Sequence, residues 1–161
     1  MGMIELIYLQ KMNNLDFEDY MASAITDYAA DKVAAGTWAK AEAEQLSKES
    51  FERLLPNGVD TEKEYLYSIL IEETRQKVGY LWFQLNETLM GKSAFILDFV
   101  IFEQVRGRGY GKKTLEALEE VAKKLGIHKI SLHVFAHNTT AIALYENAGY
   151  KNTDITMAKY L

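Results

Sequence analysis

The spacing of apolar residues in the first third of the chain predicts a short strand followed by two helices. Ile4, Leu6 and Tyr8 lie at alternate positions with Glu5 between the first two, which suggests a short half-buried strand. Beyond Asp16, a residue type that often caps helices, apolar residues recur at steps of three and four as far as Tyr28. The same period runs from Ala43 to Leu55, and the turn residues Pro56-Asn57-Gly58 end it.

Aromatic and β-branched residues then predict three consecutive strands, because the period changes from helical to extended. These strands cover Tyr65 to Ile71, Val78 to Leu85 and Ala94 to Phe102. Short polar turns separate them, so neighbouring strands should run antiparallel. Apolar residues at helical spacing follow Gly109, and Gly126 provides a C-terminal stop for that helix.

The last part of the chain predicts one more strand, a short helix and a final extended segment. The strand covers Ile130 to Phe135 and the helix covers Asn138 to Ala148, while Tyr150 to Tyr160 can supply one or two closing strands. The element order β, α, α, β, β, β, α, β, α, β predicts an α/β fold with a mixed sheet and helices on both faces. At this length we expect a single domain, residues 1–161.

Composition narrows the chemistry that this fold can perform. The chain has 18 basic and 23 acidic residues and a formal net charge of −5, which argues against a nucleic-acid-binding surface. It has no cysteine, so we expect no disulfide, no thiolate nucleophile and no metal site built on cysteine. No run of about 18 apolar residues and no secretory leader occurs, so we expect a cytoplasmic protein that does not bind membranes.

Three glycines at alternate positions mark the segment between the third of these strands and the next helix. Such glycines allow close backbone approach and leave several N–H groups pointing one way, and a helix N-terminus adds about half a positive charge. We therefore expect a pyrophosphate-binding loop, with an exposed strand-to-helix turn as the alternative. The spacing differs from the dinucleotide fingerprint and from the ATP P-loop. The residues of this loop are Arg106, Gly107, Arg108, Gly109, Tyr110, Gly111 and Lys112.

A second motif lies about 30 residues after the glycine loop and reads Asn138-x-x-Ala-x-x-Leu-Tyr-Glu-x-x-Gly-Tyr150. With the Arg-Gly-x-Gly-x-Gly loop before it, the chain resembles the GCN5-related N-acetyltransferase (GNAT) superfamily. The motif region covers Ala94 to Tyr150, and the predicted element order extends the match to most of the chain. The helical region from Asp16 to Glu64 matches no motif. The resemblance implies a mostly antiparallel sheet and acetyl-CoA as the acyl donor.

The resemblance also implies how acetyl-CoA is held. The strand before the glycine loop would offer backbone groups of Phe99, Val100 and Ile101 to the pantetheine arm, and the loop would hold the pyrophosphate. Asn138 would cap the last helix and also contact CoA or an ordered water. One departure is Glu103, which stands where many members carry proline, and we do not expect it to abolish CoA binding.

Amide formation from an amine and a thioester needs a base for the amine and an acid for the leaving thiolate. In the family, the tyrosine of the Leu-Tyr pair often serves as the acid, which here is Tyr145; simple helix packing is the alternative. His133 stands where ribosomal-protein N-terminal acetyltransferases often carry a glutamate base, and imidazole is a reasonable substitute. Asp98, His137 and a chain of water molecules are the alternative bases. A carboxylate among apolar neighbours must find a partner or have a raised pKa.

The leading hypothesis is an acetyl-CoA-dependent N-acetyltransferase that moves the acetyl group to a primary amine. Because no cysteine is available to carry the acetyl group, transfer should be direct, in a ternary complex. There are two alternatives: the enzyme uses another acyl-CoA as donor, or the chain is a non-catalytic regulatory domain that binds CoA. The identity of the acceptor amine stays open: it can be a small molecule, a protein N-terminus or a lysine. The resemblance also raises the expectation of a homodimer.

Overall fold

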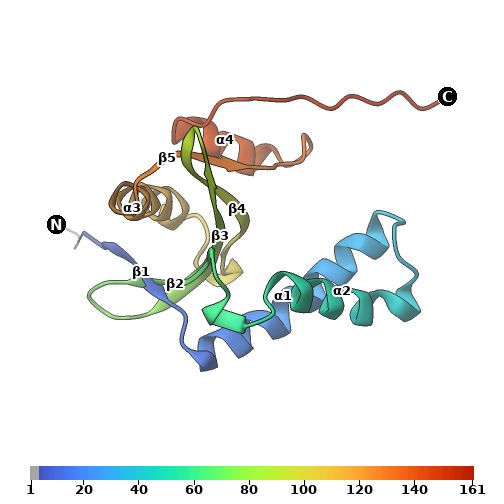
Figure 1. The fold of residues 1–161 in the computed structure, drawn as a ribbon, viewed down its shortest axis with the longest axis horizontal. Helices are drawn as coiled ribbons and strands as arrows, with labels where there is room; N and C mark the ends of the chain where they lie inside the picture. Colours follow the sequence, from blue (N-terminus) through green and yellow to red (C-terminus); the bar gives the residue numbers. More distant parts are fainter. Residues whose placement is uncertain (1–3) are drawn as a thin grey trace.

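One mixed sheet organises the computed structural model, which describes residues 4–161 (Figure 1). The strands are β1 (Ile7–Lys11), β2 (Glu64–Ile71), β3 (Lys77–Thr88), β4 (Gly91–Ile101) and β5 (Ile127–Leu132). The helices are α1 (Asn14–Ala34), α2 (Lys40–Leu54), α3 (Tyr110–Lys124) and α4 (Thr139–Asn147), with single turns η1 (Gly58–Asp60) and η2 (Glu103–Val105). Within these residues the strands lie in the order β1-β2-β3-β4-β5, and β4 and β5 pair in parallel while the other neighbours are antiparallel.

Each face of the sheet carries its own core. On one face α3 packs against the sheet through Leu115, Leu118 and Ala122, with Phe83 and Ile96 among the strand residues beneath it. On the other face α1 and α2 cover a second apolar cluster; its buried members are Met12, Tyr20, Ala24, Phe51, Leu55, Leu66, Tyr80 and Trp82. The predicted α/β fold with helices on both faces is therefore confirmed.

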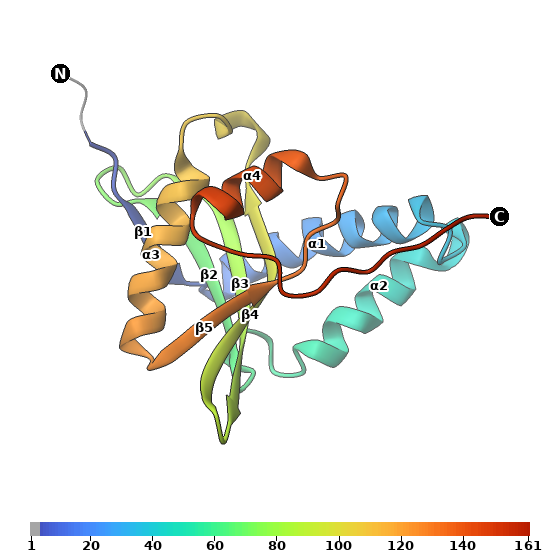
Figure 2. The same cartoon turned by 90° about the horizontal axis from the view of Figure 1, so that it is seen from above.

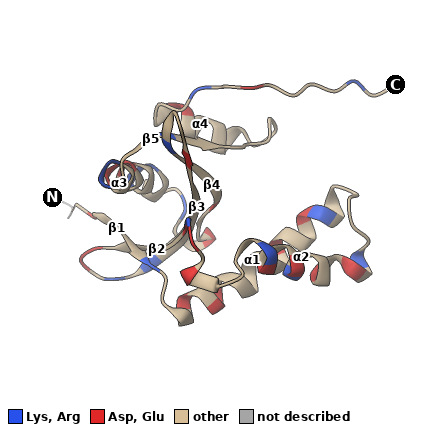
Figure 3. Cartoon of the chain, viewed as in Figure 1, with Lys and Arg blue, Asp and Glu red and all other residues tan. Residues whose placement is uncertain are grey.

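Helices α1 and α2 lie side by side and reach beyond the sheet as a two-helix arm (Figures 1 and 2). The Ser47 hydroxyl donates to the carbonyl oxygen of Ile25 over 2.7 Å and joins the two helices where both are buried. Acidic and basic residues are both spread along the two helices of this arm (Figure 3). None of the helices in residues 4–161 has the length and apolar character needed to cross a membrane.

Several boundaries differ from the sequence predictions by about one turn or less. The first strand is Ile7–Lys11 and not Ile4 to Tyr8, and the fifth is Ile127–Leu132 and not Ile130 to Phe135. Asn13, not Asp16, caps α1, because its Oδ1 accepts the Asp16 backbone N–H over 2.7 Å. The Asp16 carboxylate is occupied elsewhere, since it accepts from Lys77 at 2.8 Å and from Ser68 at 2.9 Å.

The prediction of a closing strand between Tyr150 and Tyr160 is wrong for the single chain. After α4 the backbone is extended, but Lys151 to Leu161 are all exposed and pair with no strand among residues 4–161. Figure 1 shows this segment running away from the sheet. The alternating pattern is typical of a strand, but a strand needs a partner edge within reach, and the chain leads this segment away from β5.

Candidate active site

Strand β4 separates from β5 halfway along its length, and the candidate site lies at this opening. The parallel pairing ends at Ile96 and Leu132, while β4 continues to Ile101 beside β3. From Phe99 to Ile101, β4 is therefore paired with β3 on one side only. Its unpaired backbone groups on the other side can hydrogen-bond an extended ligand, as the sequence predicts for Phe99, Val100 and Ile101.

A β-bulge at Leu97 accompanies this opening. Opposite β3, Trp82 pairs with Asp98 but the next residue, Phe83, pairs with Ile96, so β4 carries one extra residue. Before the bulge, Ile96 points into the α3 core; after it, Asp98 lies on the opposite face, where it lines a cavity. The bulge thus turns an acidic side chain into the space beside the open edge of β4.

That cavity has a volume of about 670 Å³ and lies between the two-helix arm and strands β3 and β4. Four carboxylates line it, from Asp27 and Asp31 on α1, from Asp98 on β4 and from Glu103 in η2. Its aromatic lining residues are Tyr20, Tyr28, Phe51, Tyr80, Trp82 and Phe102. The rings of Tyr28 and Phe51 meet edge to face, with centroids 5.8 Å apart, and Phe51 lies 6.0 Å from Trp82. The cavity therefore combines negative charge with apolar walls.

Asp98 is held in a defined position at the inner end of this cavity. The buried Tyr20 donates its hydroxyl proton to Asp98 Oδ2 over 2.7 Å. Burial raises the pKa of Asp98 above its ordinary value, and the Tyr20 and Phe99 hydrogen bonds counteract this only in part. The charges of Asp27 and Asp31 raise the pKa of Asp98 further. The partner and the raised pKa are those predicted for a carboxylate in this strand.

Tyr145 lies close enough to Asp98 for the two groups to influence each other. Burial raises the pKa of the Tyr145 phenol, and the negative charge of Asp98 raises it further. The Tyr145 ring packs edge to face on Tyr150, with centroids 5.7 Å apart. Helix α4 carries Tyr145 and packs close to α3. A Cβ atom at Gly111 of α3 would lie only 3.2 Å from the Leu144 side chain of α4. The phenol is thus a protonated donor at neutral pH.

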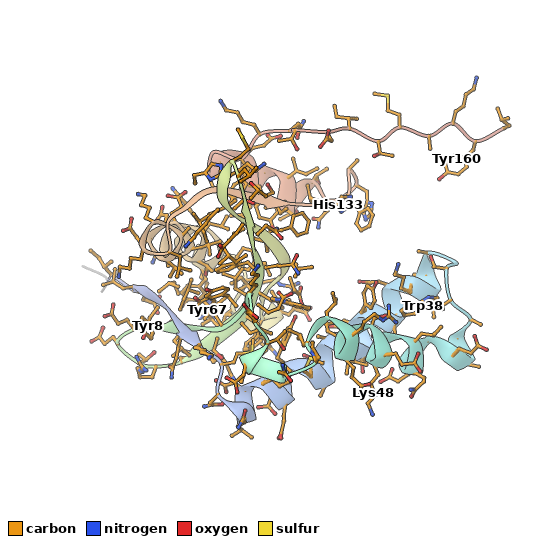
Figure 4. All side chains as sticks on the ribbon, viewed as in Figure 1. Tyr8, Trp38, Lys48, Tyr67, His133 and Tyr160 are labelled. Atoms are coloured by element: carbon orange, nitrogen blue, oxygen red, sulfur yellow. The ribbon has the colours of Figure 1, made fainter. Side chains whose placement is uncertain are left out.

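The histidines lie outside the cavity. His133 follows the last residue of β5 and is exposed, with its ring edge-on to Phe135 at 4.9 Å (Figure 4). His137 is also exposed and stacks on the other side of Phe135 at 5.7 Å. The structure therefore places Asp98 within electrostatic reach of Tyr145, whereas Tyr145, His133 and His137 all lie outside the residues that line the cavity. A catalytic role for either histidine stays a prediction.

The glycine loop has the geometry that a phosphate group requires. Gly107 and Gly109 have φ angles of 78° and 83°, which favour glycine, and the space where their side chains would begin is empty. Helix α3 starts immediately after Gly109, and its first turn contains no acidic residue. Arg108 and Lys112 are exposed on either side of this helix start. The backbone of the loop and the positive end of the helix dipole thus face open space, and two cationic residues stand close by in the sequence.

Two loop residues are placed differently from the others. Arg106 turns back toward β4, where its Nε donates to the carbonyl oxygen of Ile101 over 2.9 Å, and it lines the cavity. Tyr110 is buried in the α3 core, and its hydroxyl donates to the Glu5 carboxylate at 3.1 Å. Tyr110 can therefore contact a phosphate only through its backbone. Asn138 caps α4, as predicted, by accepting from the Ala141 N–H at 3.2 Å.

The cavity is lined by residues that sequence reasoning did not single out. Tyr20 belongs to the apolar face of the helix that the sequence predicts after Asp16, but nothing in the sequence shows that its hydroxyl reaches β4. Asp27 and Asp31 are one helical turn apart and lie beside that apolar face, so they resemble ordinary solvent-facing residues. Residues 4–161 contain no cluster of three histidine or carboxylate side chains suited to hold a metal ion.

Comparisons with known proteins agree with this geometry. The model of the Acetyltransferase (GNAT) family matches residues 21–150. Two Bacillus subtilis proteins named uncharacterized N-acetyltransferases are similar over nearly their whole length. YycN is 43% identical over 96% of this chain and 99% of its own, and YdgE is 35% identical over 95% and 97%. The crystal structure of YycN has a TM-score of 0.86 at 44% identity and covers 96% of this chain and 98% of that one.

Proposed function

The chain belongs to the GNAT family of acetyltransferases, and on that premise we propose that it transfers the acetyl group of acetyl-CoA directly to a primary amine. The observation that carries this proposal is the placement of the Asp98 carboxylate in the cavity where β4 leaves β5, within electrostatic reach of the Tyr145 phenol. One group can accept a proton and the other can donate one. The empty glycine loop at the start of α3 supports acetyl-CoA as the donor.

Asp98 serves as the base in this mechanism. Its carboxylate takes one proton from the incoming ammonium group, and the raised pKa brings its proton affinity closer to that of the amine. Tyr20 keeps the carboxylate oriented while this happens, since its hydroxyl donates to one of the two carboxylate oxygens. The neutral amine nitrogen then attacks the thioester carbonyl carbon, and a C–N bond forms.

Tyr145 serves as the acid. The C–S bond of the thioester breaks as the tetrahedral intermediate collapses, and the phenol proton of Tyr145 goes to the leaving sulfur. The phenolate regains a proton from the nitrogen that becomes the amide, and Asp98 releases its proton to solvent. The products are the N-acetylated acceptor, CoA with a free thiol, and one proton. The ordinary pKa of a tyrosine, near that of a thiol, suits this exchange.

The lining of the cavity supports a cationic amine as the acceptor. Asp27 and Asp31 add negative charge at the side of the cavity away from the sheet, which attracts an ammonium group and raises its local concentration. The rings of Tyr28 and Phe51 offer apolar and cation–π contact to the rest of the molecule. We therefore propose an acceptor that combines an amino group with an apolar body of small or moderate size.

Titration calorimetry with acetyl-CoA, ATP and NADH tests the donor. We expect micromolar binding of acetyl-CoA alone, because the loop spacing fits neither of the other two ligands. A panel of diamines, amino sugars, lysine derivatives and peptides, read by release of the CoA thiol, then tests the acceptor. Absence of acetyl-CoA binding, or equal binding of all three ligands, would contradict the proposal. Binding without thiol release for any amine would favour a non-catalytic role.

A further inference from the structure

Glu64 is a buried carboxylate that takes no part in the proton transfers described above. It is the first residue of β2 and is only 9% exposed. Its Oε2 accepts the indole N–H of Trp82 over 2.9 Å, and its Oε1 accepts the side-chain amide of Gln84 over 2.7 Å. No lysine or arginine among residues 4–161 forms an ion pair with it. Burying a charge without a cationic partner is costly, and a neutral side chain would fill the same space at a lower cost.

The indole of Trp82 stands between this carboxylate and that of Asp98. Trp82 and Asp98 are direct partners across β3 and β4, so their side chains leave the same face of the sheet side by side. Leu66 of β2 lies opposite Trp82 on its other flank, and Glu64 is two residues before Leu66 and therefore on the same face. Across three neighbouring strands the order is thus carboxylate, indole, carboxylate.

The Trp82 N–H has a carboxylate on either side and bonds the one in β2. A buried indole N–H needs an acceptor, and Trp82 is only 2% exposed, so water does not supply one. Trp82 lines the cavity that contains Asp98, whereas Glu64 does not. With its N–H engaged on the side of β2, the indole meets the cavity as an apolar ring, next to the ring of Phe51 at 6.0 Å.

The direction of this N–H matters for Asp98. Asp98 already accepts hydrogen bonds from the Tyr20 hydroxyl and from the Phe99 N–H. A base must keep a free lone pair for the proton that it takes. A third hydrogen bond, from the Trp82 N–H, would occupy the carboxylate and stabilise its charged form, which lowers the pKa of Asp98 and makes it a weaker base. The bond between Trp82 and Glu64 prevents this.

We propose that Glu64 is a positioning residue for acetyl transfer: it holds the Trp82 N–H on the β2 side, keeps Asp98 free to accept the amine proton, and presents an apolar indole to the acceptor. The inference rests on the proposed function, in which Asp98 is the base. Glu64 acts through Trp82 alone, so its removal should have no effect on Asp98 once the indole N–H is also absent.

Kinetics across pH provide the first test. Glu64→Met removes the acceptor and keeps a similar shape, and we expect kcat to fall by about 10-fold or more. The acidic limb of the kcat/KM profile should move to lower pH by about 0.5 units or more, because the freed N–H turns to Asp98. Glu64→Gln removes the charge but keeps an oxygen acceptor, so its kcat should stay within about threefold of wild type and its limb should not move. Equal shifts in both variants would assign the effect to charge and overturn the proposal.

The other titratable groups near the two carboxylates are unchanged in this comparison. Asp98 is faced by Tyr20, Asp27 and Asp31 of α1 and by Tyr145 of α4. On the outer side of Glu64, a separate cavity of about 330 Å³ is lined by Lys11, Asp60 and Lys63 among others. Glu64→Met and Glu64→Gln remove the same charge from these surroundings, so a difference between the two variants reports on the indole N–H.

Trp82→Phe provides the second test, because phenylalanine has no N–H. Adding Glu64→Met to Trp82→Phe should not move the acidic limb any further, and a full additional shift would contradict the role of the N–H. Asp98→Asn separates this inference from the proposed function. Normal turnover in Asp98→Asn would remove Asp98 as the base and the inference with it. A large loss there, together with a wild-type profile in Glu64→Met, would reject only the role of Glu64.

The NMR signal of the Trp82 indole N–H provides a test that does not depend on turnover or on the folding of Glu64→Met. The chain has two tryptophans, so Trp38→Phe identifies the Trp82 signal. We expect this signal downfield of an unbonded indole and slow to exchange in D2O. Glu64→Gln should move it upfield, because a neutral acceptor bonds more weakly than a carboxylate. A signal at the unbonded position, or one that Glu64→Gln leaves unmoved, would overturn the proposal.

Discussion

The hydroxyl of Tyr20 lies 2.7 Å from Oδ2 of Asp98 and donates a hydrogen bond to it across 78 positions of sequence. This bond joins α1 of the two-helix arm to the bulged part of β4. Tyr20 is buried, and burial and the negative charge of Asp98 both raise the pKa of its phenol, so the donor stays protonated. The two-helix arm is thereby connected directly to the group that we propose as the base.

Asp98→Asn should keep acetyl-CoA binding and lower kcat by about 10²-fold or more, because the amide cannot accept the amine proton. The amide oxygen can still accept the Tyr20 hydrogen bond, so the local structure should be preserved. Steady-state kinetics and titration calorimetry separate the two effects. His133→Ala is the matched comparison, and we expect its kcat to stay within about threefold of wild type.

The opposite result would be informative. Loss of turnover in His133→Ala, with near-normal turnover in Asp98→Asn, would move the base to the exposed histidine that the sequence resemblance favours. The pH–rate profile distinguishes the two cases as well. With Asp98 as base, the acidic limb should persist in His133→Ala and disappear in Asp98→Asn.

Tyr20→Phe should shift the acidic limb of the kcat/KM profile to higher pH. The Tyr20 hydrogen bond stabilises the charged form of Asp98 and so lowers its pKa, in opposition to burial. Without that bond, the pKa of Asp98 rises further, and a higher pH is needed to deprotonate it. Rates measured across pH at low substrate concentration test this. A uniform fall in rate with no shift of the limb would indicate that Tyr20 has a packing role alone.

Asp98→Asn should also stabilise the protein at neutral and alkaline pH. The pKa of Asp98 is raised in the folded state, so this group lowers the unfolding free energy as pH rises through the interval between its ordinary and raised values. The amide has no such penalty. We expect Tm of the variant to exceed that of wild type by about 2–4 °C at pH 8. The difference should vanish near pH 3, where the carboxyl is protonated in both states.

Local patterns in the sequence were sufficient to predict the main elements of the fold. Apolar residues recur at helical spacing around Tyr20, and aromatic and β-branched residues are dense in β3. Both patterns indicate which positions are buried, and so which type of element forms. The predicted ends of the elements were less accurate. At β5 the predicted start was too late, because Gly126 ends α3 and the strand begins at the very next residue. Residues 151–161 show a further limit of sequence patterns. Their pattern is typical of a strand, but strand pairing needs a free sheet edge within reach, and the pattern cannot show where that edge lies.

The conformation of the glycine loop was predictable from the sequence, and the surroundings of Asp98 were not. Positive φ angles, such as those of Gly107 and Gly109, can be inferred from the sequence because few residues other than glycine adopt that conformation. The position of Asp98 depends on a one-residue bulge in β4, which reverses the face that each later residue occupies. Nothing in an alternating pattern marks such a bulge, so the partnership of Tyr20 with Asp98 becomes visible only in three dimensions.

Tyr145→Phe should lower kcat by about 10²-fold while leaving the Kd for acetyl-CoA within about threefold of wild type. The ring contact with Tyr150 is kept, so α4 should not move, and the proton donor alone is lost. Tyr150→Phe is the control, since it removes a neighbouring hydroxyl from the same buried pair. If both variants lose activity equally, the hydroxyl of Tyr145 has no special role and the acid must be sought elsewhere.

Gly109→Glu should abolish acetyl-CoA binding, with at least a 100-fold rise in Kd, because a carboxylate would enter the space proposed for the pyrophosphate and repel it. A control is needed, since any side chain at a φ of 83° also strains the backbone. Gly36→Glu provides it: Gly36 has a φ of 75°, also faces open space, and lies in the turn between α1 and α2. The two variants should lose similar Tm in differential scanning fluorimetry, because each places the same side chain in the same strained conformation. Acetyl-CoA should then raise the Tm of wild type and of Gly36→Glu but not that of Gly109→Glu. A Gly109→Glu protein that still gains Tm with acetyl-CoA would show that the pyrophosphate lies elsewhere.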